Sequence, residues 1–178
     1  MDTMNRHISL LLMTLLFSVG VIAQPGSTDN QIDEAISYAE EGAFERALMM
    51  IEPLLENEAK NDARAWYVAG YAHKGRYKDY AFRNTSTSKT ASAERSTAVE
   101  QLMKAYALDK KSVFPGKISE LVEDALDYLA KTYMNDAVKG VHGFQIGLDE
   151  EILGYFMEFV KIKKVLNPNE NRVKEEVE

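Results

Sequence analysis

The sequence predicts an all-α fold, and three observations support this prediction. Apolar residues recur every three or four positions along six separate segments, which is the spacing of one helix face. The strict apolar–polar alternation of a half-buried strand is missing from the same segments. Mostly short polar turns separate the segments. Because an amphipathic helix must bury its apolar face, six such helices joined by short turns indicate stacked helical hairpins.

The six predicted helices follow one another from residue 32 to residue 166. The first carries its apolar face on Ile32, Ala35, Ile36 and Ala39 and ends at Gly42, a residue that tolerates the left-handed backbone of a helix C-terminus. The others are expected at about Ala43–Asn57, from Ala65 onward, over Ala98–Leu108, over Ile118–Phe144 and over Ile152–Leu166, with Pro168 as the final stop.

The N-terminus has the features of a secretory signal peptide. A weakly basic start at Arg6 and His7 precedes the apolar run Ile8–Phe17, and Val21–Ala23 offers compact residues for cleavage. The apolar run is short for a spanning helix, which needs about 20 apolar residues. We therefore expect residues 1–23 to be removed, residues 24–30 to form a flexible exit, and the mature protein to be periplasmic or secreted without membrane insertion.

Composition narrows the classes of partner and cofactor. The chain has 178 residues, a formal net charge of −7 and no cysteine. This length suits one domain, expected at 31–168, followed by a charged tail at 169–178. An acidic balance argues against nucleic acid and anionic membranes as partners. Without cysteine there are no disulfides and no zinc sites built on thiolates, and we expect no cofactor.

Small and aromatic residues repeat at fixed positions in the first two predicted hairpins. In the first unit, about 28–61, they are Ala35, Tyr38, Gly42, Phe44, Ala47 and Ile51. In the second they are Trp66, Ala69, Gly70, Ala98 and Ala105. This pattern resembles the tetratricopeptide repeat (TPR) family, whose unit is a helix–turn–helix of about 34 residues. The resemblance implies an α-α superhelix of about three TPR-like hairpins in a right-handed stack.

The match to the family weakens along the chain. A Ser/Thr-rich stretch interrupts the second unit between Lys78 and Thr97 and predicts a mobile loop at about 83–94. The third unit is degenerate: Gly140 stands at the position of the family's glycine, but Phe156 replaces a usual alanine. The long insert and the exit Leu108–Lys111 resemble exported TPR proteins of Bacteroidetes-type bacteria.

Residues able to carry out catalysis are scarce. His73 and His142 are not spaced as the i, i+4 pair of a helical zinc site, and we expect both to be structural. The segment Gly70–Arg76 lacks the Lys-Ser/Thr ending of a phosphate-binding loop. Acidic pairs such as Glu40-Glu41 stand at predicted helix ends, where charge is solvated. The sequence therefore predicts a protein that is not an enzyme and has neither a catalytic nor a metal site.

The family resemblance implies a concave surface, lined by the first helix of each hairpin, that binds a peptide or helix of another protein. Its positions in the second unit are Arg64, Tyr67, Tyr71 and Lys74, and exposed Tyr and Arg often dominate binding energy. In the first unit they are Ile32, Ile36 and Glu40. The alternative interpretation is that Tyr67 and Tyr71 pack inside the fold.

These expectations define a non-catalytic interaction module, acting as a scaffold or assembly factor. Two other functions stay open. One is a structural protein that forms a homo-oligomer, because a weak third repeat leaves the stack poorly capped. The other is a small-ligand binder or enzyme that uses a cavity near His142 and Phe144.

Overall fold

The computed structural model describes residues 27–83, 88–111, 117–142 and 149–168, and these residues form six α-helices and no strand. The predicted all-α class is therefore confirmed. The helices are α2 (Thr28–Glu40), α3 (Phe44–Leu55), α4 (Ala63–Arg83), α5 (Ser88–Asp109), α6 (Lys117–His142) and α7 (Asp149–Leu166).

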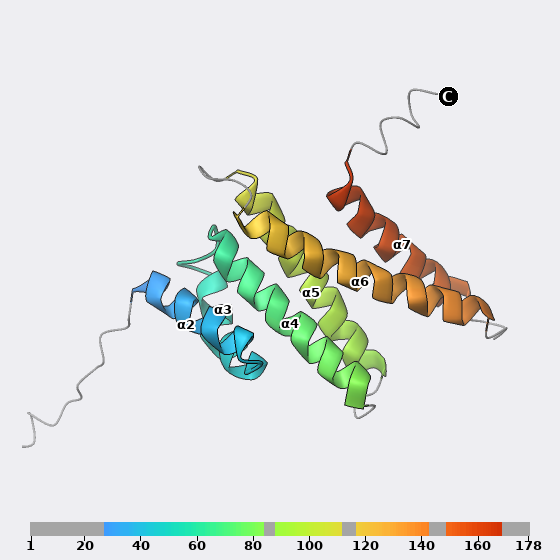
Figure 1. Cartoon of the computed structure of the whole chain (residues 1–178), viewed down its shortest axis with the longest axis horizontal. Coiled ribbons are helices and arrows are strands. Elements are labelled where there is room, and N and C mark those ends of the chain that lie inside the picture. The colour runs from blue at the N-terminus through green and yellow to red at the C-terminus, as the bar shows by residue number, and fades with distance from the viewer. Residues whose placement is uncertain (1–26, 84–87, 112–116, 143–148, 169–178) are drawn as a thin grey trace, which may run out of the picture.

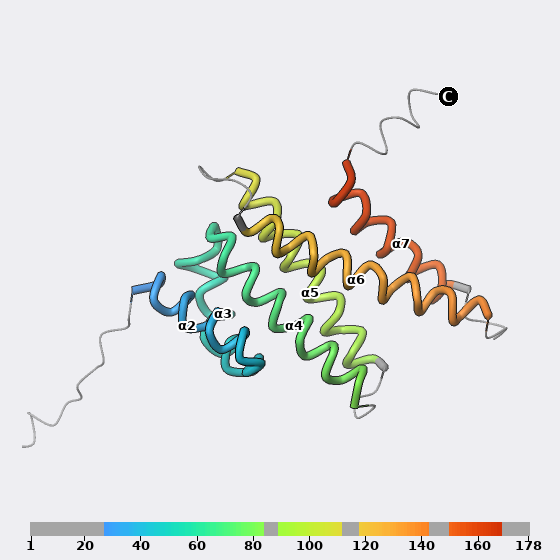
Figure 2. The backbone as a smooth tube through the Cα atoms, in the orientation of Figure 1, coloured from blue at the N-terminus to red at the C-terminus, as the bar shows by residue number. Residues whose placement is uncertain are grey.

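The helices are arranged as three successive pairs. Each helix packs against the next one in the chain, and α4 also packs against both α2 and α6. Figure 1 shows the pairs following the chain across the molecule, from α2 and α3 at one end to α6 and α7 at the other. The backbone trace in Figure 2 shows α4 and α5 running beside each other over most of their length. The first helices of the three pairs are thus brought together through α4.

Local signals mark the ends of the first helices. The Ser27 hydroxyl accepts a hydrogen bond from the backbone N–H of Asn30 at 3.4 Å, which caps the start of α2. Gly42, at φ +80°, follows the end of α2, as its predicted role requires. The Asp62 carboxylate accepts a hydrogen bond from the backbone N–H of Arg64 at 2.8 Å at the start of α4.

Apolar side chains form two core clusters that meet at α4. The first cluster holds α2, α3 and the first half of α4, and the second holds α4 to α7. Trp66 packs against both clusters, and its indole N–H donates to the Lys60 carbonyl at 2.9 Å. The largest fully buried side chains, divided between the two clusters, are Ile32, Ile51, Val68, Val99, Leu102, Val122, Leu126, Leu129 and Ile162.

Two glycines allow the paired helices to approach closely. A Cβ at Gly70 would lie 2.7 Å from Leu102 Cγ and 3.2 Å from the Ala98 carbonyl oxygen, so α4 and α5 touch there almost backbone to backbone. A Cβ at Gly140 would lie 2.6 Å from Cγ1 of Ile152, where α6 meets α7. Small residues at these contacts permit the interhelical distance that the packing needs.

The loop predicted at about 83–94 is mostly helical, and that prediction was wrong. Helix α4 continues to Arg83 and α5 begins at Ser88, so only residues 84–87 lie outside the description. The physical reason lies in Glu94 and Arg95, which are buried and paired: Glu94 contacts His73, and Arg95 contacts Asp136. These tertiary contacts offset the weak helix preference of the Ser/Thr-rich stretch.

Several expectations fall at or beyond the edges of the described chain. The predicted signal peptide 1–23, the tail 169–178 and Phe144 all lie outside the described residues. Residues 28–30 of the predicted flexible exit 24–30 are helical, because α2 begins at Thr28. Among the described helices, none combines the length and apolar composition that crossing a bilayer requires.

Candidate functional site

Three of the four predicted binding residues lie together on α4. Tyr67, Tyr71 and Lys74 are spaced four and three residues apart, which places them on one helix face. The rings of Tyr67 and Tyr71 have centroids 5.8 Å apart and are tilted by 42°. Lys74 Nζ lies 4.4 Å from the centroid of the Tyr71 ring, within the range of a cation–π contact. The three side chains therefore form one continuous line.

Helix α6 extends this line with a tyrosine that the sequence did not single out. The ring centroid of Tyr128 lies 5.9 Å from Nζ of Lys74 and 5.5 Å from Nζ of Lys78. We call Tyr67, Tyr71, Lys74, Lys78 and Tyr128 the tyrosine–lysine strip. Lys78 could have been found by continuing the α4 spacing by one turn. Tyr128 could not, because only the packing of α6 on α4 brings it there.

The two lysines of the strip carry charge that the described part of the chain does not neutralise. Neither Lys74 nor Lys78 is within ion-pair distance of a carboxylate in that part. Burial, followed by repulsion from Lys78, lowers the pKa of Lys74, and attraction to Asp124 only partly opposes this. The strip is thus a positively charged site on a chain whose net charge is −7.

The two α4 tyrosines combine a packing role with partial exposure. Tyr67 packs against the second core cluster and Tyr71 against the first. Part of each ring therefore packs inside the fold, which was the alternative to a role in binding. Both side chains nevertheless remain half-buried rather than buried. Burial, with smaller effects of Tyr71 and Glu40, raises the pKa of Tyr67 to about 12. Tyr67 is therefore neutral at physiological pH, and both rings present an aromatic surface.

Arg64, the fourth predicted residue, is engaged within the fold. Its guanidinium lies 2.5 Å from Asp29, 3.4 Å from Asp33 and 3.0 Å from Asp62. Hydrogen bonding to Asp62 raises the pKa of Arg64 still further, against the effect of burial. Because Asp29 and Asp33 belong to α2, Arg64 joins α2 to α4 and is not part of the strip.

The predicted positions in the first unit differ from one another in exposure. Ile32 is fully buried in the first core cluster, and Ile36 is half-buried against the same cluster. Glu40 is exposed and close enough to Tyr67 to affect its pKa. Of the three, Glu40 and part of Ile36 are available at the surface beside the tyrosine–lysine strip.

His73 belongs to a buried polar cluster rather than to an open site. Its Nδ1 lies 2.6 Å from Glu94, its Nε2 lies 3.3 Å from Glu52, and Glu94 pairs with Arg76 at 2.9 Å. The cluster links α4 to α3 and α5, which accounts for the histidine structurally. His142 is exposed at the end of α6. Within the described ranges, no three His, Cys, Asp or Glu side chains gather as a metal site would require.

A buried arginine, Arg95, stands where four helices meet. Arg95 on α5 has only 3% of its side chain exposed, and its guanidinium lies 3.9 Å from the Tyr133 ring centroid and 5.3 Å from that of Tyr155. It pairs with Asp136 at 2.7 Å and lies over Tyr77. Next to it is an open cavity of about 400 Å³ between α5, α6 and α7, lined by Ser92, Ser96, Tyr133, Glu151, Gly154, Tyr155, Met157 and Glu158.

Comparison with known proteins identifies no relative. The chain matches no protein-family model, no curated protein and no solved structure. The resemblance to the TPR family therefore stays a prediction from the residues.

Proposed function

We propose that the protein is a non-catalytic interaction module that binds a peptide or helix of another protein across the tyrosine–lysine strip. The proposal includes the TPR-like reading of the fold, in which the three helix pairs form a superhelical stack with α2, α4 and α6 on its binding side. In its favour, α4 contacts both α2 and α6, and glycines stand at the close contacts within the second and third pairs. A scaffold or assembly factor is the corresponding biological role.

The observation that carries the proposal is the chemistry of the strip. Tyrosine rings offer contact area at low conformational cost, and a partly desolvated lysine such as Lys74 attracts a carboxylate more strongly than a fully hydrated one does. Lys74 and Lys78 lack carboxylate partners within the described residues, whereas Arg64 and Arg95 are both paired internally. A ligand that fits is therefore an acidic segment with apolar or aromatic side chains, presented as a helix or an extended peptide.

The test is site-specific photo-crosslinking in the native host. A photoreactive residue at the exposed position 78 should capture a defined partner, and a photoreactive residue at Lys60, in the turn before α4, should not. The change Lys74→Met with Lys78→Met should reduce capture from a probe at position 128 about tenfold, because two charge-assisted contacts are lost.

A matched control keeps this test specific. The double change Lys60→Met with Lys111→Met removes two exposed lysines that lie outside the strip, so it lowers the net charge equally and should leave capture unchanged. Equal capture by the strip variant and the unmodified protein, with both folded by circular dichroism, would show that binding occurs elsewhere. The strip variant, Lys74→Met with Lys78→Met, leaves Tyr67 and Tyr71 in place, because replacing either tyrosine would also disturb the core.

We also propose that this interaction module is exported and that it is not an enzyme. The apolar run Ile8–Phe17 and the compact residues before Gln24 support export to the periplasm or to the medium. N-terminal sequencing of the protein recovered from its native host tests this directly, since cleavage after Ala23 leaves Gln24 as the first residue.

A further inference from the structure

Helix α7 carries apolar residues on two opposite sides, and only one side is covered. The inward side is formed by Tyr155, Phe159, Ile162 and Leu166, which pack against the second core cluster, with Ile162 fully buried. On the outward side, Leu153, Met157 and Val160 are 58%, 63% and 45% exposed. An apolar side of a helix is normally packed against another element of the protein or of a partner. The outward side is therefore an unpartnered apolar face.

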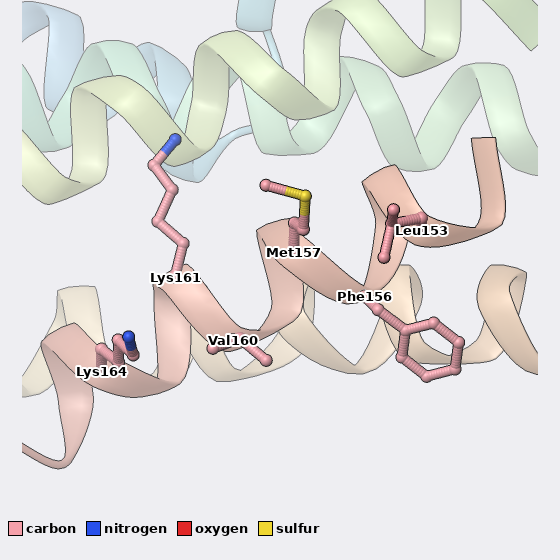
Figure 3. Close-up of a pocket in the computed structure, with 6 residues that line it drawn as sticks. All are labelled: Leu153, Phe156, Met157, Val160, Lys161 and Lys164. Carbon is pink, nitrogen blue, oxygen red and sulfur yellow. The ribbon is translucent and has the colours of Figure 1, made fainter. Parts of the chain in front are cut away.

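A hollow of about 600 Å³ lies over this outward side. Its lining consists of Leu153, Phe156, Met157, Val160, Lys161 and Lys164. Figure 3 shows that all six side chains project from α7 itself. The hollow thus has a single wall within the described helices.

The outward side has the spacing of a coiled-coil seam. Glu150, Leu153, Met157, Val160 and Lys164 follow one another at intervals of three, four, three and four residues, which keeps them on one line along the helix. The seam covers about four helical turns, or roughly 21 Å. Its three central residues are apolar, and a charge of opposite sign stands at each end.

The charges at the two ends of the seam favour an antiparallel partner of the same sequence. In an antiparallel pair centred on Met157, Glu150 of each copy lies opposite Lys164 of the other. In a parallel pair, Glu150 would face Glu150 and Lys164 would face Lys164, which is repulsive. Both end residues are exposed, and neither forms an ion pair inside the described part of its own chain.

We propose that a second copy of this chain covers the outward side of α7, in a two-fold symmetric, antiparallel α7–α7 contact. Such a surface is self-complementary, as a two-fold interface requires. The contact involves one helix from each copy, which is smaller than a standard interface of about 800 Å² per partner. A dissociation constant on the order of micromolar is expected.

The experiment measures oligomeric state by sedimentation velocity over a concentration series of the full chain. The unmodified protein should shift from monomer to dimer as its concentration rises. Met157→Asp places two carboxylates at the centre of the contact and should weaken the dimer at least about 100-fold. Because Met157 is mostly exposed, the variant should keep the thermal midpoint that the unmodified monomer shows at low concentration. Met49→Asp on α3, where the side chain is 77% exposed, is the matched control and should leave the dimer intact.

Charge exchange tests the antiparallel direction. Glu150→Lys alone and Lys164→Glu alone each replace two attractive pairs by two repulsive ones and should weaken the dimer about tenfold or more. The double variant restores opposite charges across the contact and should return the dissociation constant to within about threefold of the original. A parallel contact would respond to none of these exchanges.

Three results would overturn the proposal: an unmodified chain that stays monomeric throughout, a dimer that Met157→Asp does not affect, or a double exchange that fails to restore association. The contact lies on α7, which contributes no residue to the tyrosine–lysine strip. The result of the sedimentation experiments is therefore independent of the crosslinking result.

Discussion

The middle and last helix pairs are built alike but are completed differently. In the α4–α5 pair, Gly70 brings the two backbones together, and neighbouring pairs pack on either side. In the α6–α7 pair, Gly140 meets only the side chain of Ile152, and the outward side of α7 stays uncovered. Within the described part of the chain, the last pair thus repeats the close contact of its predecessor but has one face that no other helix covers.

The largest effect is expected where the two pairs are joined, at Arg95. Arg95→Ala should destabilise the fold by about 3 kcal/mol, because it removes a buried side chain packed on three tyrosines and the partner of Asp136. Equilibrium urea unfolding measures the change. Arg83→Ala, whose side chain is 67% exposed, is the control and should cost less than about 0.5 kcal/mol. Similar losses for the two variants would contradict the role assigned to Arg95.

A second prediction compares the glycine contacts of the two pairs. Gly70→Ala should cost about 2 kcal/mol, because the new methyl group meets the backbone of α5 and the helices must separate. Gly140→Ala should stay within about 0.5 kcal/mol of the unmodified protein, since the Ile152 side chain can rotate and alanine favours the helix. Thermal unfolding of both variants measures the two changes in stability. Equal destabilisation would mean that α6 and α7 are held as rigidly as α4 and α5.

The smallest effect on stability is expected in the tyrosine–lysine strip. There the substitution should stabilise the protein, whereas Arg95→Ala and Gly70→Ala should destabilise it. Burial lowers the pKa of Lys74 below 10.5, so the protonated lysine costs stability below its folded pKa. As the pH rises from the folded pKa toward 10.5, the unfolded chain holds the proton more tightly, and this cost disappears. Lys74→Met should therefore stabilise the protein slightly at neutral pH, and the gain in the free energy of unfolding should shrink in alkali. A destabilised Lys74→Met at neutral pH would indicate a structural role for the ammonium group.

The binding residues show how far spacing along one helix can be read. The family resemblance implies Tyr67, Tyr71 and Lys74 as binding positions, their intervals put them on one face of α4, and the structure places them in contact. Arg64 shares that interval, but acidic residues 31 and 35 positions earlier engage it, so spacing alone could not show that it is occupied. The helical conformation of the Ser/Thr-rich stretch escaped prediction for a related reason: its stability comes from pairing of Glu94 and Arg95 with other helices.

The sequence by itself determined the helical class, the stop at Gly42 and the face of α4 that carries the tyrosines, because helix periodicity and glycine's conformational freedom are local properties. Only the tertiary structure decided that Tyr128 joins the strip, that Arg95 is enclosed by tyrosines, and that Leu153, Met157 and Val160 are left exposed. These outcomes depend on contacts between residues far apart in the chain. Periodicity shows that α7 has two apolar sides, but only packing reveals which of them is covered.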